Sequence, residues 1–159
     1  MEAAINGTFA GVAAIRLDPG EDVFCSIRDY CREHNIRNGV ILPMHGSLSR
    51  AQCFTVTHLP ETSQKYGYSE PLVYEEICEL LGGSGTITHE ENGTINIHVH
   101  CAFGAEDGHT FGGHMTPGNK VLLVTEVVIG IIEDIDLIGV RVGTDGLRFI
   151  PRSCESKES

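Results

Sequence analysis

The chain has 159 residues, 22 of them acidic and 11 basic, and its net charge is −11 with histidine neutral. This length fits a single domain that can bury a sizeable core. A charge of this sign opposes non-specific binding to nucleic-acid backbones, which requires clustered lysine and arginine. The densest basic group, Arg28, Arg32 and Arg37, shares its segment with Asp29 and Glu33. No apolar run approaches the roughly 20 residues of a membrane helix. The N-terminus also lacks the features of a signal peptide, so we expect a cytoplasmic protein without a membrane contact.

The N-terminal part of the chain predicts a strand followed by a helix. Residues 8–17 are mostly apolar and indicate the strand. Asp18 suits a helix cap and Pro19 suits the first helical position, so we place the one clear α-helix at about residues 19–34. Apolar side chains recur there at helical spacing and indicate one buried stripe, made of Val23, Phe24, Ile27, Tyr30 and Cys31.

The middle of the chain is less regular. Residues 40–42 and 47–57 indicate two short strands, and the prolines and glycine of residues 59–71 indicate a loop. Residues 72–81 fit either a helix or one face of a strand, and both interpretations stay open. The glycine-rich run at 82–85 favours a bend or bulge between strands over a phosphate-binding loop.

The C-terminal half predicts successive β-hairpins. Its expected strands cover residues 86–88, 95–103, 121–132, 135–142 and 147–150. The fold class is therefore α+β, with a mainly antiparallel β-sheet and one clear α-helix in a single domain. We assign residues 1–150 to this domain and residues 151–159 to a polar C-terminal tail.

Histidines mark the most informative segment, which lies between residues 94 and 114. Apolar and polar residues alternate from Ile95 to Phe103, a pattern typical of a half-buried strand. His98 and His100 fall on the polar face, and His114 follows after a probable turn and a Gly-Gly pair. Three imidazoles brought together favour an open metal site with three protein ligands and water. Zinc is the expected ion, although imidazole suits other divalent transition metals as well.

The register of the next hairpin decides whether His114 can join the other two rings. A two-residue turn at Asp107-Gly108 would pair His114 with Cys101, on the core side of the sheet. We therefore predict a one-residue bulge at Gly112-Gly113, which would set His114 beside His100. A regular ladder through both glycines would count against the triad.

Other assignments of the histidines stay open. His98 and His100 would also suit solvent-facing strand positions, with His114 in a turn, and His109 competes as the third ligand. The remaining histidines are expected to be ordinary surface or loop residues: His34, His45, His58 and His89.

Two charged residues stand out beside these histidines. Glu126 interrupts the apolar run at 121–132, where a buried carboxylate is costly unless it is paired, coordinated or protonated. It could support a metal-bound histidine or act as a general acid or base; alternatively it pairs with an arginine or lies at a subunit surface. Arg16 ends an apolar strand and could anchor an anionic substrate or simply pair with an acid.

Short motifs, in this order, resemble the PPC domain (plants and prokaryotes conserved domain) family: Arg16-Leu17-x-x-Gly20-Glu21, Gly83-Ser84-Gly85-Thr86-Ile87, His98-Val99-His100, Gly112-Gly113-His114 and Thr125-Glu126-Val127-Val128-Ile129. The resemblance covers roughly residues 7–150. It implies an α+β fold, a homotrimer and a histidine cluster at His98, His100 and His114. In fold, the family is similar to acetolactate decarboxylase, whose zinc is held by an H-x-H pair and a later histidine.

Two functions follow from the residues and the resemblance. In one, the protein is a metal-dependent lyase or hydrolase for a small anionic carbonyl compound, where Arg16 binds a carboxylate and Glu126 moves a proton. In the other, it is a non-catalytic assembly or regulatory module. Plant members of the family follow AT-hook segments in DNA-binding proteins, but this chain has no Arg-Gly-Arg-Pro hook and is acidic. Direct binding of nucleic acid is therefore not expected.

Overall fold

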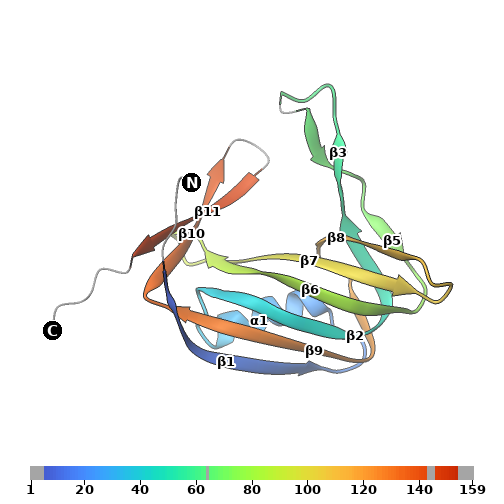
Figure 1. The fold of residues 1–159 in the computed structure, drawn as a ribbon, viewed down its shortest axis with the longest axis horizontal. Helices are drawn as coiled ribbons and strands as arrows, with labels where there is room; N and C mark the ends of the chain where they lie inside the picture. The colour runs from blue at the N-terminus through green and yellow to red at the C-terminus, as the bar shows by residue number, and fades with distance from the viewer. Residues whose placement is uncertain (1–5, 64, 143–145, 154–159) are drawn as a thin grey trace.

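The computed structural model describes residues 6–63, 65–142 and 146–153. Within these residues the chain forms a strongly curved sheet with a helix behind it, and a small hairpin that stands away from the body (Figure 1). The elements in chain order are β1 (Thr8–Leu17), α1 (Val23–Glu33), β2 (Gly39–Phe54), β3 (Val56–His58), β4 (Tyr66–Tyr68), β5 (Leu72–Tyr74), β6 (Cys78–His89), β7 (Ile95–Ala105), β8 (Thr110–Met115), β9 (Lys120–Glu133), β10 (Ile135–Val142) and β11 (Gly146–Ser153).

The predicted fold class is confirmed. The main sheet has the strand order β1-β9-β2-β8-β7-β6-β10-β11, and its described pairings are antiparallel except for a parallel contact between β6 and β10. β2 is 16 residues long; its first part lies between β9 and β6, and its end pairs with β5 and β8. The sheet therefore curls around β2 and has one concave face and one outer face.

The core lies between α1 and the concave face of this sheet. α1 buries Val23, Ile27 and Cys31, which lie at the helical spacing expected for one stripe. In β7, Val99 and Phe103 are fully buried and point the same way, because alternate residues of a strand share a face. The polar residues between them point outward, so the outer face of β7 is the face with the histidines.

The helix begins later than expected. Asp22 is the N-cap, and its Oδ1 accepts a hydrogen bond of 3.0 Å from the amide of Cys25. Residues 18–21 form a tight turn instead, because Gly20 has φ of +86°, which is incompatible with a helix. The expectation that Asp18 caps the helix is therefore wrong, although Glu21 does bond back to the Asp18 amide as a capping-box acid would.

The middle of the chain holds more strand than expected. Residues 40–42 and 47–57 belong largely to one continuous strand, β2. The segment expected as a loop forms one side of a two-stranded hairpin, β3 with β4, which we call the arm. The open choice for residues 72–81 resolves as strand, in β5 and the start of β6. The expected irregularity near residues 82–85 is present, since the β6–β7 register shifts between Leu80 and Gly82.

The last described strand runs past residue 150. β11 extends to Ser153, three residues into the segment expected as a tail, and residues 154–159 lie outside the described residues. The division of the chain at residue 150 stays a prediction. Among the described residues, no helix has the length and apolar character needed to cross a membrane.

Candidate metal centre

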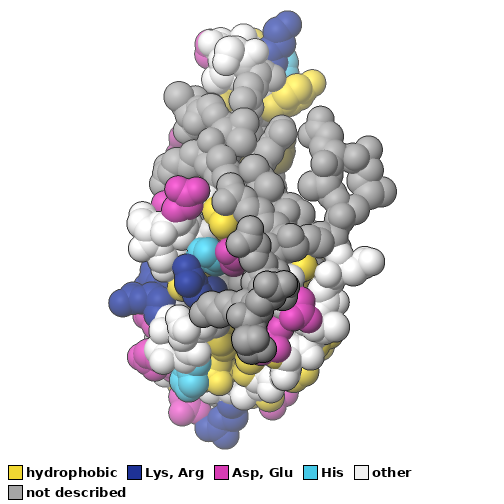
Figure 2. Space-filling model, turned by 90° about the vertical axis from the view of Figure 1, so that its left-hand side faces the viewer, with side chains coloured by type: hydrophobic (Ala, Val, Ile, Leu, Met, Phe, Trp, Pro, Cys, Tyr) yellow, Lys and Arg dark blue, Asp and Glu magenta, His cyan; other side chains and the backbone are white. Residues whose placement is uncertain are grey.

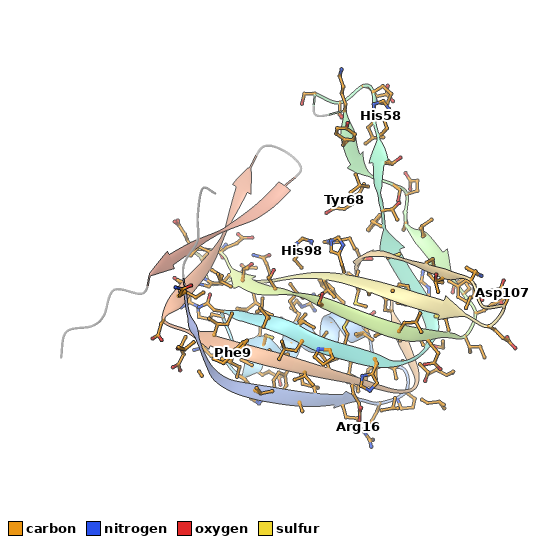
Figure 3. All side chains as sticks on the ribbon, in the orientation of Figure 1. Phe9, Arg16, His58, Tyr68, His98 and Asp107 are labelled. Atoms are coloured by element: carbon orange, nitrogen blue, oxygen red, sulfur yellow. The ribbon has the colours of Figure 1, made fainter. Side chains whose placement is uncertain are left out.

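β7 supplies the first two histidines of the cluster. His98 and His100 are both exposed and project from the outer face of the strand, as the alternating sequence predicts. Their Nε2 atoms are 3.1 Å apart, and the ring centroids are separated by 5.0 Å. In Figure 3 the labelled His98 points away from the body of the sheet, toward the space beneath the arm.

β8 supplies the third histidine by a route that differs from the prediction. His114 pairs directly with His100, so the three rings do share one face. The ladder through Gly112 and Gly113 is nevertheless regular, and the predicted bulge there is wrong. A regular ladder was expected to exclude the triad, and that reasoning fails because it assumed a two-residue turn.

The turn between β7 and β8 is one residue longer than expected, and this shifts the register of the hairpin by one residue. Ala105 and His109 form the closing pair, and the amide of Gly108 donates to the carbonyl of Ala105 over 3.0 Å. The loop therefore has three residues, with Gly108 at φ of +87° in the left-handed position that such loops require. One extra turn residue reverses the parity of β8 and turns His114 outward.

The Gly-Gly pair serves close packing of strands. A Cβ on Gly112 would lie 2.3 Å from the carbonyl oxygen of Cys101, and a Cβ on Gly113 would lie 2.1 Å from that of Phe54. Only glycine allows β7, β8 and β2 to approach this closely. The two glycines thus fix the strand that carries His114.

The three rings could hold one cation. Their potential ligand atoms all lie within 4.8 Å of one another. Two nitrogens bound tetrahedrally to zinc at 2.0–2.1 Å would be separated by about 3.3–3.4 Å, close to the observed spacing of the His98 and His100 nitrogens. The Nδ1 of His114 is buried and has no hydrogen-bond partner among the described residues. A cation bound through that atom would supply the missing partner, so the donor set fits a transition metal.

Two of the three rings, those of His98 and His114, are held in the neutral form that a metal needs. Burial first, and then the neighbouring His98 and His100, lower the pKa of His114 to about 4. Burial, followed by repulsion from His100, lowers the pKa of His98. Neutral imidazoles offer a free lone pair, so these two residues can bind a cation at neutral pH without first losing a proton.

The arm adds an aromatic residue that the sequence did not indicate. The Tyr68 ring lies 5.2 Å from the His114 ring and 6.1 Å from the Phe54 ring, measured between centroids. Tyr68 is half-exposed and comes from β4, within the segment expected to be a loop. Figure 3 shows Tyr68 between the arm and the labelled His98.

Arg16 and Glu126 are not brought to the histidine cluster within the chain. They are partners in the β1–β9 ladder, and Glu126 is separated from β7 by β2 and β6, which places it about 14 Å away along the sheet. Figure 3 shows Arg16 at the far edge of the sheet from His98. Arg16 forms an ion pair with Asp18, and both side chains are exposed.

Glu126 is exposed, which overturns the premise that it is a buried carboxylate. Its Oε2 lies 3.1 Å from Nε2 of His45, a residue on the outer face of β2. A solvated carboxylate in this position needs no metal or buried counter-charge. Within the chain, Arg16 pairs with an acid, which was one of its two alternatives, and Glu126 pairs with a histidine rather than with an arginine.

The competing and remaining histidines occupy other environments. His109 forms an ion pair with Asp107 in the β7–β8 turn and is absent from the cluster. His89 was expected at the surface and is instead 3% exposed, with Nε2 2.6 Å from Oδ1 of Asp136. No local signal could have revealed this burial, because the partner lies 47 positions away in the sequence.

A sequence profile of the Plants and Prokaryotes Conserved (PCC) domain matches residues 5–133. The chain belongs to this family. The bifunctional protein GlmU of Synechococcus sp. (strain JA-3-3Ab) is 30% identical to this chain over 118 residues. That match covers 74% of this chain and 17% of GlmU, so the chain spans about one sixth of the length of this relative.

Solved proteins from two archaea share the fold. A plant- and prokaryote-conserved protein from Pyrococcus horikoshii has a TM-score of 0.78 at 19% identity, covering 92% of this chain and 96% of its own. A metal-containing protein from Archaeoglobus fulgidus has a TM-score of 0.76 at 20% identity, with the same coverage. At these identities the similarity establishes the fold alone. The expected likeness to acetolactate decarboxylase stays a prediction.

Proposed function

We propose that this PCC-domain protein binds one divalent transition metal, zinc in the first instance, through His98, His100 and His114. The observation that carries the proposal is the convergence of three ring systems from β7 and β8 on one exposed face. The lowered pKa values of His98 and His114 favour the ligating form. The metal content of the Archaeoglobus fulgidus relative, with 20% identity and the same fold, is consistent with it.

The site would act on a small anionic carbonyl compound, as a lyase or a hydrolase. A bound zinc ion with three protein ligands supplies a Lewis acid and keeps one position for water or substrate. His98 and His100 are open to solvent, so a small molecule can reach that side of the cluster. The three histidines would hold the metal ion and so fix the position of the substrate. Tyr68, which lies against the His114 ring, would limit the access of small molecules from the side of the arm.

The roles proposed for Arg16 and Glu126, carboxylate binding and proton transfer, require a neighbouring subunit. Within one chain the separation from β7 to Glu126 is too large for both groups to contact one small substrate. We therefore include a homotrimer in the proposal. Large apolar residues on the surface favour such an assembly, since Val12, Val56, Tyr66 and Leu123 are each between 62% and 70% exposed.

A non-catalytic assembly module is the second candidate. The arm favours it, because an isolated two-stranded hairpin is only marginally stable in water, and this one exposes Val56, Tyr66 and Tyr68. Contact with another chain would cover these residues. A relative from Bacteroides thetaiotaomicron is named as a candidate DNA-binding protein, at 15% identity. The net charge of −11 opposes that activity here, so we do not propose it for this chain.

Metal analysis of purified, untagged protein tests the proposal. The wild type is expected to retain close to one zinc per chain, and His98→Ala/His100→Ala is expected to lose it. His34→Ala/His58→Ala is a matched control, because it removes the same number of exposed histidines outside the cluster. Equal metal in the wild type and the first variant would refute the site. A metal-loaded protein that turns over no 2-keto or 3-keto acid would favour the assembly module.

A further inference from the structure

A basic cavity lies at the end of the molecule away from the β7–β8 turn. It has a volume of about 390 Å³ and lies between the C-terminal end of α1 and the β6–β7 turn. Its walls are made by Cys31, Arg32, Asn35, Arg37, Gly93 and Ile95. Figure 2 views this end and shows lysine and arginine side chains gathered beside a histidine. Two arginines on one cavity make it locally basic, although the chain as a whole has a net charge of −11.

A chain of polar contacts through the buried His89 positions Arg37. Its Nη2 lies 3.2 Å from Nδ1 of His89, whose Nε2 lies 2.6 Å from Oδ1 of Asp136. Asn38 donates to the same carboxylate oxygen over 3.1 Å. The Nδ1 atom is also 3.0 Å from the carbonyl oxygen of Glu90. Among the described residues the Arg37 guanidinium makes this one hydrogen-bond contact, through Nη2, so its other N–H donors can bind a ligand.

Arg32 has a similarly weak set of partners. Its Nη1 is 3.4 Å from Oδ1 of Asp29, a long contact, and its side chain is 64% exposed. Asp29 is shared with Arg28, so it compensates neither arginine fully. Two guanidinium groups with spare donors therefore converge on one space. The guanidinium fork matches the oxygen spacing of phosphate, which it can bind with two parallel hydrogen bonds.

We propose that this cavity binds a phosphate dianion carried by a small molecule, with Arg32 and Arg37 as the two binding groups. The volume exceeds that of phosphate alone and falls within the range of small-molecule sites. The negative end of the α1 dipole lies nearby and opposes an anion, but this effect decays within the last turn and is weaker than two charge-assisted hydrogen bonds. Asn35 also lines the cavity.

The phosphate site is separate from the histidine cluster. Ile95 lies three residues before His98 in β7 and therefore points to the opposite face of the strand. Ile95 packs against the core, whereas His98 is exposed on the outer face. Phosphate binding thus does not depend on the proposed metal, and the two proposals can fail independently.

Titration of the full-length protein with inorganic phosphate, at constant ionic strength and followed by backbone amide NMR, tests the proposal. We expect saturable binding, with shifts at residues 31–37 and 93–95, that Arg32→Gln/Arg37→Gln weakens at least tenfold. Arg28→Gln is the matched control, since Arg28 lies one turn earlier on α1 and does not line the cavity. It should change affinity less than twofold.

Further variants keep the test decisive. Arg32→Gln alone should weaken binding about threefold or more, and it leaves the buried His89 contact of Arg37 in place. His98→Ala/His100→Ala should bind phosphate as the wild type does. Unsaturable shifts, or equal loss in Arg28→Gln and Arg32→Gln, would reduce the effect to general charge screening and overturn the proposal.

Discussion

Protonation of His114 should destabilise the metal-free protein in mild acid. Its pKa falls from 6.5 to about 4 on folding, mainly because the ring is buried. Between these two values the unfolded chain binds a proton that the folded chain does not, so the contribution is complete above pH 6.5 and is lost as the pH falls toward 4. The full shift corresponds to about 3 kcal/mol. The ring is only partly buried, and solvent screening reduces the expected loss to about 1–2 kcal/mol.

Urea unfolding of chelator-treated protein at several pH values between 7.5 and 4.5 measures this loss. His114→Gln removes the titrating group and keeps a polar side chain of similar length. The free energy of unfolding of the variant should therefore fall about 1–2 kcal/mol less than that of the wild type over this range. His34→Gln, at an exposed histidine, should follow the wild type. Parallel curves for His114→Gln and the wild type would refute the reasoning.

Three other substitutions separate the fold from the site. Gly113→Ala places a Cβ 2.1 Å from the carbonyl oxygen of Phe54. The variant should lose about 1–3 kcal/mol of unfolding free energy in urea, and its affinity for zinc should fall at least tenfold. An unchanged affinity would show that this contact does not hold β8 in place. Asp22→Ala removes the helix cap and an acceptor for the Gly118 amide at 2.7 Å, and should cost about 1–2 kcal/mol by thermal unfolding with its zinc content intact. Ile27→Ala leaves a cavity at a fully buried position on α1, and should lower the free energy of unfolding by about 2–5 kcal/mol. The folded fraction of this variant should bind as much zinc as the wild type. Less zinc per folded molecule would contradict the assignment of the site to β7 and β8.

The histidine face was predictable because a strand has a period of two. The alternation from Ile95 to Phe103 fixes the side of the sheet that His98 and His100 occupy, whatever the rest of the fold does. The orientation of His114 depended instead on one residue in the β7–β8 turn. Asp107-Gly108 suits both a two-residue and a three-residue loop, and the choice between them is made by pairing along the whole hairpin.

Other differences also have local causes. The break expected after residue 42 corresponds to a register shift between Ile41 and Met44, where Pro43 interrupts the ladder without ending β2. Of the residues that indicated a loop at 59–71, Pro60 lies between β3 and β4 and Pro71 directly precedes β5, whereas Gly67 is the middle residue of β4. Contacts far apart in the sequence, such as His89 with Asp136, leave no pattern that a single chain can show.

The exposure of Glu126 is a further difference from what the sequence suggested. A carboxylate in an apolar run suggested burial, but β9 exposes this face, so Glu126 stays solvated beside His45. Its outward direction follows from the same alternation that turns Val127 into the core. The sequence contained this information, yet the apolar residues at the neighbouring exposed positions concealed it.

A crystal of the zinc-loaded protein, measured on both sides of the zinc absorption edge, tests the central claim most directly. The account predicts one anomalous peak per chain, about 2.0–2.1 Å from one ring nitrogen of each of His98, His100 and His114. A fully loaded crystal whose peak lies elsewhere, or whose ion is bound by fewer than three of these rings, would contradict it.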